Sequence, residues 1–292
     1  MGSGTWTTMA YASTVSNKRG FDGSYLSANS LNMDTQTVYT STHMQSHLNP
    51  KNVIRECCDN EEHPETVPVI LALDVTGSMG PSARMAAGKL NEIMTSLFSK
   101  VKDVEFLTMA IGDLACDFSP IQASQFESDA RICDQLLDMY FEGGGGGNGF
   151  ESYTGAWWFG LNHTKLDCWD RGKKGIIITL GDEPLNPYLP ARRVRDVFGD
   201  SIEADIDTKD LYQKVTEKFD VYHIAITDHS CYRMYQQEIE NSFGKLLGER
   251  YMTSTCDELA EVVTNIVVSA STHYDFVSSN PGVTVTEDGI AW

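Results

Sequence analysis

The sequence predicts an α/β fold in which a doubly wound, mostly parallel sheet occupies residues 67–272. Apolar runs bounded by turn residues recur here, and a run without polar alternation is typical of a strand buried on both faces. The clearest such runs lie at 67–74, 104–111 and 175–180. Segments with apolar residues at helical spacing separate them, so strands and helices alternate. This alternation favours parallel strands joined by right-handed crossovers, as in Rossmann-like folds.

The predicted strands follow in order from Val67. The first contains Val-Ile-Leu-Ala-Leu and ends at Asp74, and a later one contains Ile-Ile-Ile-Thr-Leu at 176–180. Both are expected to be buried parallel strands. The other predicted strands lie at 104–111, 116–121, 221–227 and 250–253.

The predicted helices are indicated by apolar residues three or four positions apart. The first, over about 82–100, carries Ala86, Leu90, Ile93, Met94 and Leu97. The last begins near Leu259 and includes Val263 and Val267. The others lie at 132–140, 153–161, 191–198, 208–219 and 232–247. A run of glycines, Gly143–Gly147, interrupts the chain between two of them.

The flanking segments differ in composition from this region. Residues 1–66 are rich in Ser, Thr, Asn and Tyr and show no helical period, which predicts an irregular N-terminal arm or a small β extension. Residues 273–292 predict an extended C-terminal tail, polar apart from its end. The expected organisation is therefore an arm (1–66), one α/β domain (67–272) and a tail (273–292).

Charge and composition exclude several classes of function. The 292 residues include 41 acidic and 22 basic ones, a net charge of −19. Such a surface repels the phosphate backbone of nucleic acid and anionic membrane surfaces, whereas divalent cations suit it. We expect no secretory signal and no membrane-spanning helix. The seven cysteines are odd in number and lack CxxC spacing, which favours reduced thiols in the cytoplasm.

The loop after the first predicted strand, Asp74-Val-Thr-Gly-Ser-Met-Gly80, concentrates hard oxygen ligands. Asp74, Thr76 and Ser78 alternate, so their side chains can point at one place, and a carboxylate with two hydroxyls suits Mg²⁺ or Mn²⁺. Ligands bind beyond the carboxyl ends of strands in such sheets. Two alternatives remain: a serine-hydrolase elbow, with Thr76 where its first glycine belongs, and simple capping of the next helix.

This loop resembles the metal-ion-dependent adhesion site of von Willebrand factor type A (vWA) domains, whose pattern is Asp-x-Ser/Thr-x-Ser. The string DVTGSMG is similar to intracellular bacterial and phage members, and the resemblance covers about residues 67–272. It implies the vWA fold and a bound Mg²⁺, with Mn²⁺ or Ca²⁺ as alternatives. It also implies two further ligand loops, one carrying a hydroxyl and one an aspartate.

The aspartate loop follows the strand at 175–180. Its sequence, Gly181-Asp182, differs from the family's Thr-Asp-Gly, and Asp182 is the expected ligand. Glu183 and a solvated turn are the alternatives. In the hydroxyl loop, Ser152 matches the ligand position of Thr-x-Thr-Gly, whereas relatives with a Pro-Glu-Ser loop suggest Glu151. Glu151 could instead only face a helix N-terminus.

The resemblance implies a metal that binds rather than reacts. In the family, an open coordination position accepts an Asp or Glu of a partner protein, and many intracellular relatives act beside AAA+ ATPases of the MoxR kind. The first expectation is therefore a non-enzymatic, divalent-dependent protein-interaction module. The second is a metal-dependent hydrolase using Asp74 and Asp182, with His223 or His229 as general base. The third is a structural subunit whose arm and tail tie neighbouring copies together.

Overall fold

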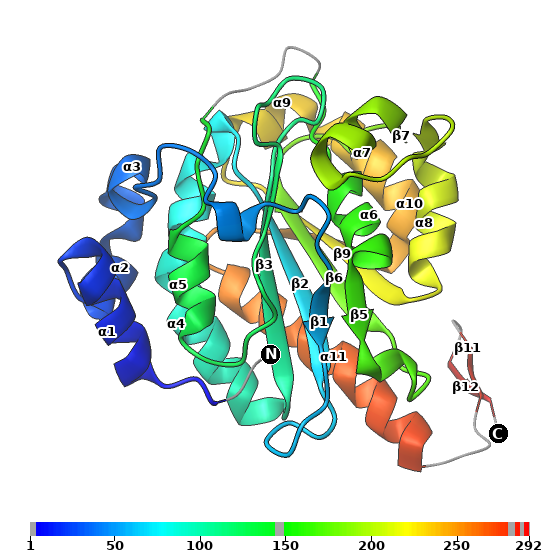
Figure 1. Ribbon diagram of the computed structural model, residues 1–292, viewed down its shortest axis with the longest axis horizontal. Coiled ribbons are helices and arrows are strands. Elements are labelled where there is room, and N and C mark those ends of the chain that lie inside the picture. Colours follow the sequence, from blue (N-terminus) through cyan, green and yellow to red (C-terminus); the bar gives the residue numbers. More distant parts are fainter. Residues whose placement is uncertain (1–3, 144–148, 280–283, 287–288, 292) are drawn as a thin grey trace.

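A central six-stranded sheet with helices on both faces forms the body of the protein (Figure 1). The computed structural model describes residues 4–143, 149–279, 284–286 and 289–291, and describes no side chain for Ser78 or beyond residue 271. In spatial order the strands are β10 (Tyr251–Ser254), β9 (Phe219–Ile226), β6 (Gly175–Gly181), β2 (Val67–Asp74), β3 (Val104–Ile111) and β4 (Ile121–Ala123). Neighbours pair in parallel except β4, which is antiparallel to β3. The predicted α/β architecture with a mostly parallel sheet is confirmed.

Two apolar cores lie on opposite faces of the sheet, because successive side chains of a strand point to opposite sides. Val69, Leu71 and Leu73 of β2 face one core, and Ile70 and Ala72 face the other. The helices of the first core include α4 (Gly80–Lys100), α5 (Arg131–Leu137) and α11 (Leu259–Ser279). Those of the second are α6 (Thr154–Asn162), α7 (Ala191–Phe198), α8 (Thr208–Thr216) and α9 (Ser230–Ile239).

The order of strands places a switch point between β2 and β6. Counted along the chain, the six strands stand in the order 3-2-1-4-5-6, and the direction of progression reverses between the first strand, β2, and the fourth, β6. Sheets of this order bind ligands in the crevice at that reversal, beyond the carboxyl ends of the strands. Leu73 pairs with Leu180, so the chain leaves both strands side by side at this edge.

The first part of the N-terminal segment, residues 8–38, is mainly helical, so the prediction of an irregular arm or β extension was wrong there. It forms α1 (Thr8–Arg19), α2 (Gly23–Asn29) and α3 (Thr35–Val38), which lie along α4 in Figure 1. Polar caps start all three helices: the side chains of Thr7, Asp22 and Asp34 accept hydrogen bonds from backbone N–H groups of the first turns. Tyr11, Val15 and Leu26 are buried in the first core. The segment therefore packs on its own domain.

Other boundaries also differ from the sequence prediction. The strand expected at 116–121 is displaced to β4, and the helix expected over 232–247 ends as α9 at Ile239. A π-turn (Glu240–Gly244) and the short helix α10 (Lys245–Leu247) follow it. Helix α11 runs to Ser279, six residues beyond the predicted start of an extended tail at 273.

Short elements complete the described chain. Two-stranded pairs join β1 (Arg55–Cys57) to β5 (Thr164–Leu166) in parallel, and β7 (Tyr188–Leu189) to β8 (Ile206–Asp207) and β11 (Thr284–Thr286) to β12 (Gly289–Ala291) antiparallel. Single 3₁₀ turns lie at 30–32, 46–48, 77–79, 167–169 and 248–250. No described helix combines the length and apolar character needed to cross a bilayer.

Candidate functional site

Carboxyl groups from three loops converge at the switch point. Asp74 is the last residue of β2, Asp182 directly follows β6, and Glu151 precedes α6. Their exposed fractions are 0%, 0% and 1%. The charges interact, because the Asp182 carboxyl helps to raise the pKa of Asp74 and the Asp74 carboxyl helps to raise the pKa of Glu151. The structure therefore brings together the three acids that the sequence analysis placed in three separate loops.

Hydrogen bonds occupy both oxygens of Asp74. Thr76 donates to Oδ1 from its backbone nitrogen (2.9 Å) and from its hydroxyl (2.6 Å). The Tyr153 hydroxyl donates to Oδ2 (3.0 Å). Burial and the neighbouring Asp182 carboxyl nevertheless raise the pKa of Asp74 well above its usual range. Thr76 thus lies where the sequence placed it, whereas the part played by Tyr153 was not predicted.

The phenol of Tyr153 fills the space above Gly181. A Cβ atom at position 181 would lie 2.5 Å from Cζ and 2.7 Å from Cε1 of this ring, and closer still to its hydroxyl oxygen. Only glycine fits there while Tyr153 reaches Asp74. This contact explains why the third loop reads Gly181-Asp182, with no side chain on the residue before the aspartate.

Glu151 is the most isolated of the three acids. Its backbone N–H donates to the Pro184 carbonyl (3.2 Å), which ties the second loop to the third. Its Oε2 atom is buried and has no hydrogen-bond partner among the described atoms. Burial, followed by the Asp74 and Glu183 carboxyls, raises the pKa of Glu151 strongly. A buried carboxyl oxygen without a partner is costly, so this position calls for a proton or a cation.

The side chain of Ser152, the other candidate ligand of this loop, makes a hydrogen bond to the backbone of a neighbouring loop. Its Oγ accepts the backbone N–H of Leu114 at 2.8 Å and so holds the loop that follows β3. That loop carries Asp113 and Asp117, whose charges also act on Glu151. The side chain of Ser78, the remaining predicted ligand, lies outside the described residues.

Asp182 is held by a histidine that the sequence did not link to any acid. His229 Nδ1 lies 3.1 Å from Asp182 Oδ2, and its Nε2 lies 3.0 Å from the hydroxyl of Ser82 in the first turn of α4. Burial lowers the pKa of His229, but the hydrogen bond to Asp182 and the nearby Cys256 outweigh it and raise that pKa to about 9. The only sequence signal was the place of His229 just after a strand.

His223, the other predicted general base, is part of the core. It is fully buried in β9, its ring stacks on Phe243 with centroids 3.5 Å apart, and Thr179 Oγ1 lies 2.8 Å from its Nδ1. Burial lowers its pKa to about 3. The ring also meets Tyr153 edge-on at 5.0 Å, so it supports the phenol that binds Asp74 and does not itself lie at the acids.

The crowding of carboxyl groups at the switch point is the main electrostatic feature of the site. Burial, followed by Asp182, raises the pKa of Glu183 to about 7, and burial raises that of Asp117. Crowded carboxyls suit a hard divalent cation. Even so, the described side chains include no group of three or more His, Cys, Asp or Glu residues already arranged as a metal site.

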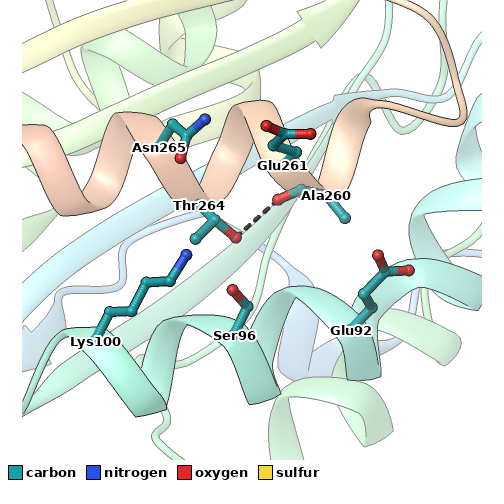
Figure 2. A pocket seen from close by; sticks show the side chains of 7 residues that line it. All are labelled: Glu92, Ser96, Lys100, Ala260, Glu261, Thr264 and Asn265. Carbon is teal, nitrogen blue, oxygen red and sulfur yellow. Dashed lines mark hydrogen bonds between the residues drawn. The ribbon is translucent and has the colours of Figure 1, made fainter.

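A small groove elsewhere on the protein is unrelated to these acids. It lies between α4 and α11, and seven residues line it: Glu92, Ser96, Lys100, Ala260, Glu261, Thr264 and Asn265 (Figure 2). The Thr264 hydroxyl donates to the Ala260 carbonyl of its own helix at 2.7 Å (Figure 2). The groove shares no residue with the switch point.

Comparison with known proteins finds distant structural similarity. No protein-family model matches the chain, and no curated protein matches it. The pilus adhesin SpaC of Lactobacillus rhamnosus GG, in an open conformation, is similar at a TM-score of 0.47 and 15% identity, over 77% of this chain and 31% of SpaC. Proximal thread matrix protein 1 of the mussel byssus is similar at a TM-score of 0.47 and 15% identity, over 73% of this chain and 49% of that protein. An aerotolerance-related membrane protein of Bacteroides fragilis is similar at a TM-score of 0.39 and 11% identity, over 70% of this chain and 98% of that protein. The chain thus spans about a third of SpaC, and similarities this weak assign neither family nor function.

Proposed function

We propose that the protein is a divalent-cation-dependent protein-interaction module with the vWA fold. The buried Oε2 atom of Glu151, which has no hydrogen-bond partner among the described atoms, carries this proposal, because it lies beside Asp74 in a cluster of carboxyl groups. The order of the strands and the place of the Asp74–Ser78 motif at their switch point support the vWA fold. A cation would neutralise the acids and remove the cost of burying them.

The proposed ligands come from three loops. Asp74, Thr76 and Ser78 belong to the first loop, Glu151 to the second and Asp182 to the third. Ser152 is the less favoured ligand of the second loop, because its oxygen already accepts the Leu114 N–H. Hard oxygen donors of this kind suit Mg²⁺, or Mn²⁺ or Ca²⁺ in its place. The cation would supply a fixed positive charge to which a carboxylate of a partner protein binds.

The partner class follows from the same chemistry. A protein that presents an Asp or Glu side chain to the cation would bind, and its affinity would depend on the divalent ion. Following the family resemblance, we propose an AAA+ ATPase of the MoxR kind as such a partner. The odd number of cysteines, seven, and their lack of CxxC spacing suit a reducing compartment, for which we propose the cytoplasm.

Titration calorimetry with Mg²⁺ and Mn²⁺ tests the site. We expect wild-type protein to bind one divalent ion and Asp74→Ala to bind none, because the variant loses a carboxylate at the centre of the cluster. Asp210→Asn, which removes an exposed charge on α8, is the matched control and should bind as wild type. Equal binding by wild type and Asp74→Ala would overturn the assignment.

One observation favours a second candidate, a hydrolase. Ser82, His229 and Asp182 form a continuous chain with separations of 3.0 and 3.1 Å, the order of groups in a serine hydrolase triad. Ser82 is only 4% exposed, which favours the interaction module. A hydrolase would turn over a p-nitrophenyl ester and lose this activity in Ser82→Ala. An interaction module would show no turnover in either protein.

A further inference from the structure

His229 stands at the junction of three elements at the edge of the sheet. It follows β9, its Nδ1 contacts Asp182 after β6, and its Nε2 faces Ser82 of α4. The Cys256 thiol, which precedes α11, lies 3.9 Å from the same Nε2 atom. The ring is 8% exposed, so protein atoms rather than water surround it.

The contact with Asp182 fixes the direction of one hydrogen bond. An ionised carboxylate can only accept, so Nδ1 carries a proton and donates to Asp182 Oδ2. Ser82 Oγ, which also lies 3.3 Å from Cys256 Sγ, meets the other ring nitrogen. With both nitrogens engaged, rotation of the ring would break two contacts together, and the ring holds one orientation.

The third loop needs such a support. Asp182 follows Gly181, which has no side chain to anchor the turn and which lies beneath the Tyr153 ring. A hydrogen bond from a fixed imidazole orients the carboxylate that accepts it, and such outer contacts are worth about 10- to 100-fold in metal affinity. Tyr153 has the corresponding role for Asp74.

We propose that His229 is a positioning residue of the divalent-cation site, which orients the Asp182 carboxylate through its Nδ1 hydrogen bond. This inference rests on the proposed function, since it concerns a residue that supports a ligand of the same cation site. His229 does not touch the cation. It acts through Asp182, and the Ser82 hydroxyl holds it in place.

Two polar substitutions of His229 test whether the hydrogen bond to Asp182, and not simply a side chain that fills the space, is required. In His229→Asn the amide nitrogen occupies the place of Nδ1 and can still donate to Asp182. In His229→Gln the amide extends toward Ser82, as Nε2 does, and the donor to Asp182 is lost. Titration calorimetry with Mn²⁺, together with thermal unfolding, is the measurement for both full-length variants and for wild type.

We expect His229→Gln to weaken Mn²⁺ binding about 10- to 100-fold and His229→Asn to stay within about threefold of wild type. The matched control is His163→Asn, since His163 Nε2 contacts the Asp200 carboxylate (2.7 Å) away from the site. That variant should bind Mn²⁺ as wild type does, although it also removes a contact between a buried histidine and an aspartate.

The outcomes distinguish this inference from the function on which it rests. The positioning role would be overturned if His229→Gln bound Mn²⁺ as tightly as wild type, or if His229→Asn bound it more weakly than His229→Gln. Binding of Mn²⁺ by wild type would still uphold the cation site in that case. Absence of Mn²⁺ binding by wild type would overturn both. Loss of affinity in His163→Asn equal to that in His229→Gln would show a general effect of packing and would also overturn the inference.

Discussion

Substitution of Gly181 by alanine tests the packing that links the three loops. The new Cβ would lie 2.5 Å from Tyr153 Cζ, where ordinary carbon contacts are about 3.5–4.0 Å. The ring must therefore move by roughly 1 Å or more. It cannot do so freely, because His223 and Phe243 meet it edge-on at 5.0 and 5.4 Å.

The cost of Gly181→Ala has two sources. Overpacking of a buried site costs about 1–3 kcal/mol. If the displaced phenol leaves Asp74 Oδ2 without its hydrogen bond, the buried acceptor costs about a further 1–3 kcal/mol. The free energy of unfolding should therefore fall by about 2–6 kcal/mol, a large part of the stability of a typical domain.

Urea denaturation followed by circular dichroism measures this change. Gly244→Ala is the control, because a Cβ there meets nothing closer than Tyr251 Cδ1 at 3.7 Å. In a Tyr153→Ala background, the Gly181→Ala substitution should cost less than about 0.5 kcal/mol, since the obstructing ring is gone. A single-variant cost below about 0.5 kcal/mol, or equal costs in both backgrounds, would refute the reasoning.

Three further predictions concern other groups. Burial raises the pKa of Glu105 from its ordinary value of 4.5 to about 7, so over this range the folded state keeps a proton that the unfolded state loses. The urea concentration at the unfolding midpoint should therefore decrease as the pH rises from about 4.5 to 7. Glu105→Gln should make this decrease with pH smaller, and an unchanged pH dependence would contradict the prediction. Asp200 contacts Trp158 Nε1 and His163 Nε2, each at 2.7 Å, so Asp200→Ala should cost about 2–4 kcal/mol in urea unfolding, and a cost below about 1 kcal/mol would be inconsistent. Mn²⁺ at 100 times its dissociation constant should add about 2.7 kcal/mol to the unfolding free energy of wild type, reversibly with chelator, and nothing to Asp74→Ala.

The sequence was sufficient for elements whose signal is local. β2 and β3 begin and end where their apolar runs predicted, because central strands buried on both faces tolerate few polar residues. Helix α7 also has its predicted bounds, with Val194 and Phe198 buried and arginines around them. Neither the runs nor this periodicity depends on distant parts of the chain.

Elements whose signal lies in distant contacts were missed. Helix α1 buries only Tyr11 and Val15, so apolar periodicity within the segment is weak. The Tyr11 hydroxyl contacts the Ala87 carbonyl of α4, 76 residues along the chain. The caps at Thr7 and Asp22 were the available local signal. β4 has three residues, which is too short for a periodic pattern.

The site divides in the same way. Asp74 and Asp182 were predicted because each follows a strand, and their order in the sheet then places them at one edge. Tyr153 and His229 were missed as supports because their partners lie 79 and 47 residues away in sequence. Ser152 and Glu151 are adjacent, and their surroundings differ through contacts that the sequence does not show, such as that of Ser152 Oγ with the Leu114 N–H.

The packing of the N-terminal helices has a consequence for how the chain can be cut and how it folds. Tyr39 donates to the Ala83 carbonyl (2.6 Å), and Trp6 Nε1 donates to Asn91 Oδ1 (3.1 Å), so this segment closes over α4. During synthesis the first helices emerge before α4 exists and must wait for it with their apolar side chains unburied. A chain shortened to begin at Val67 would expose the face of α4 that the N-terminal helices cover. Self-association of such a chain would result from this exposed apolar surface and would not indicate a natural assembly.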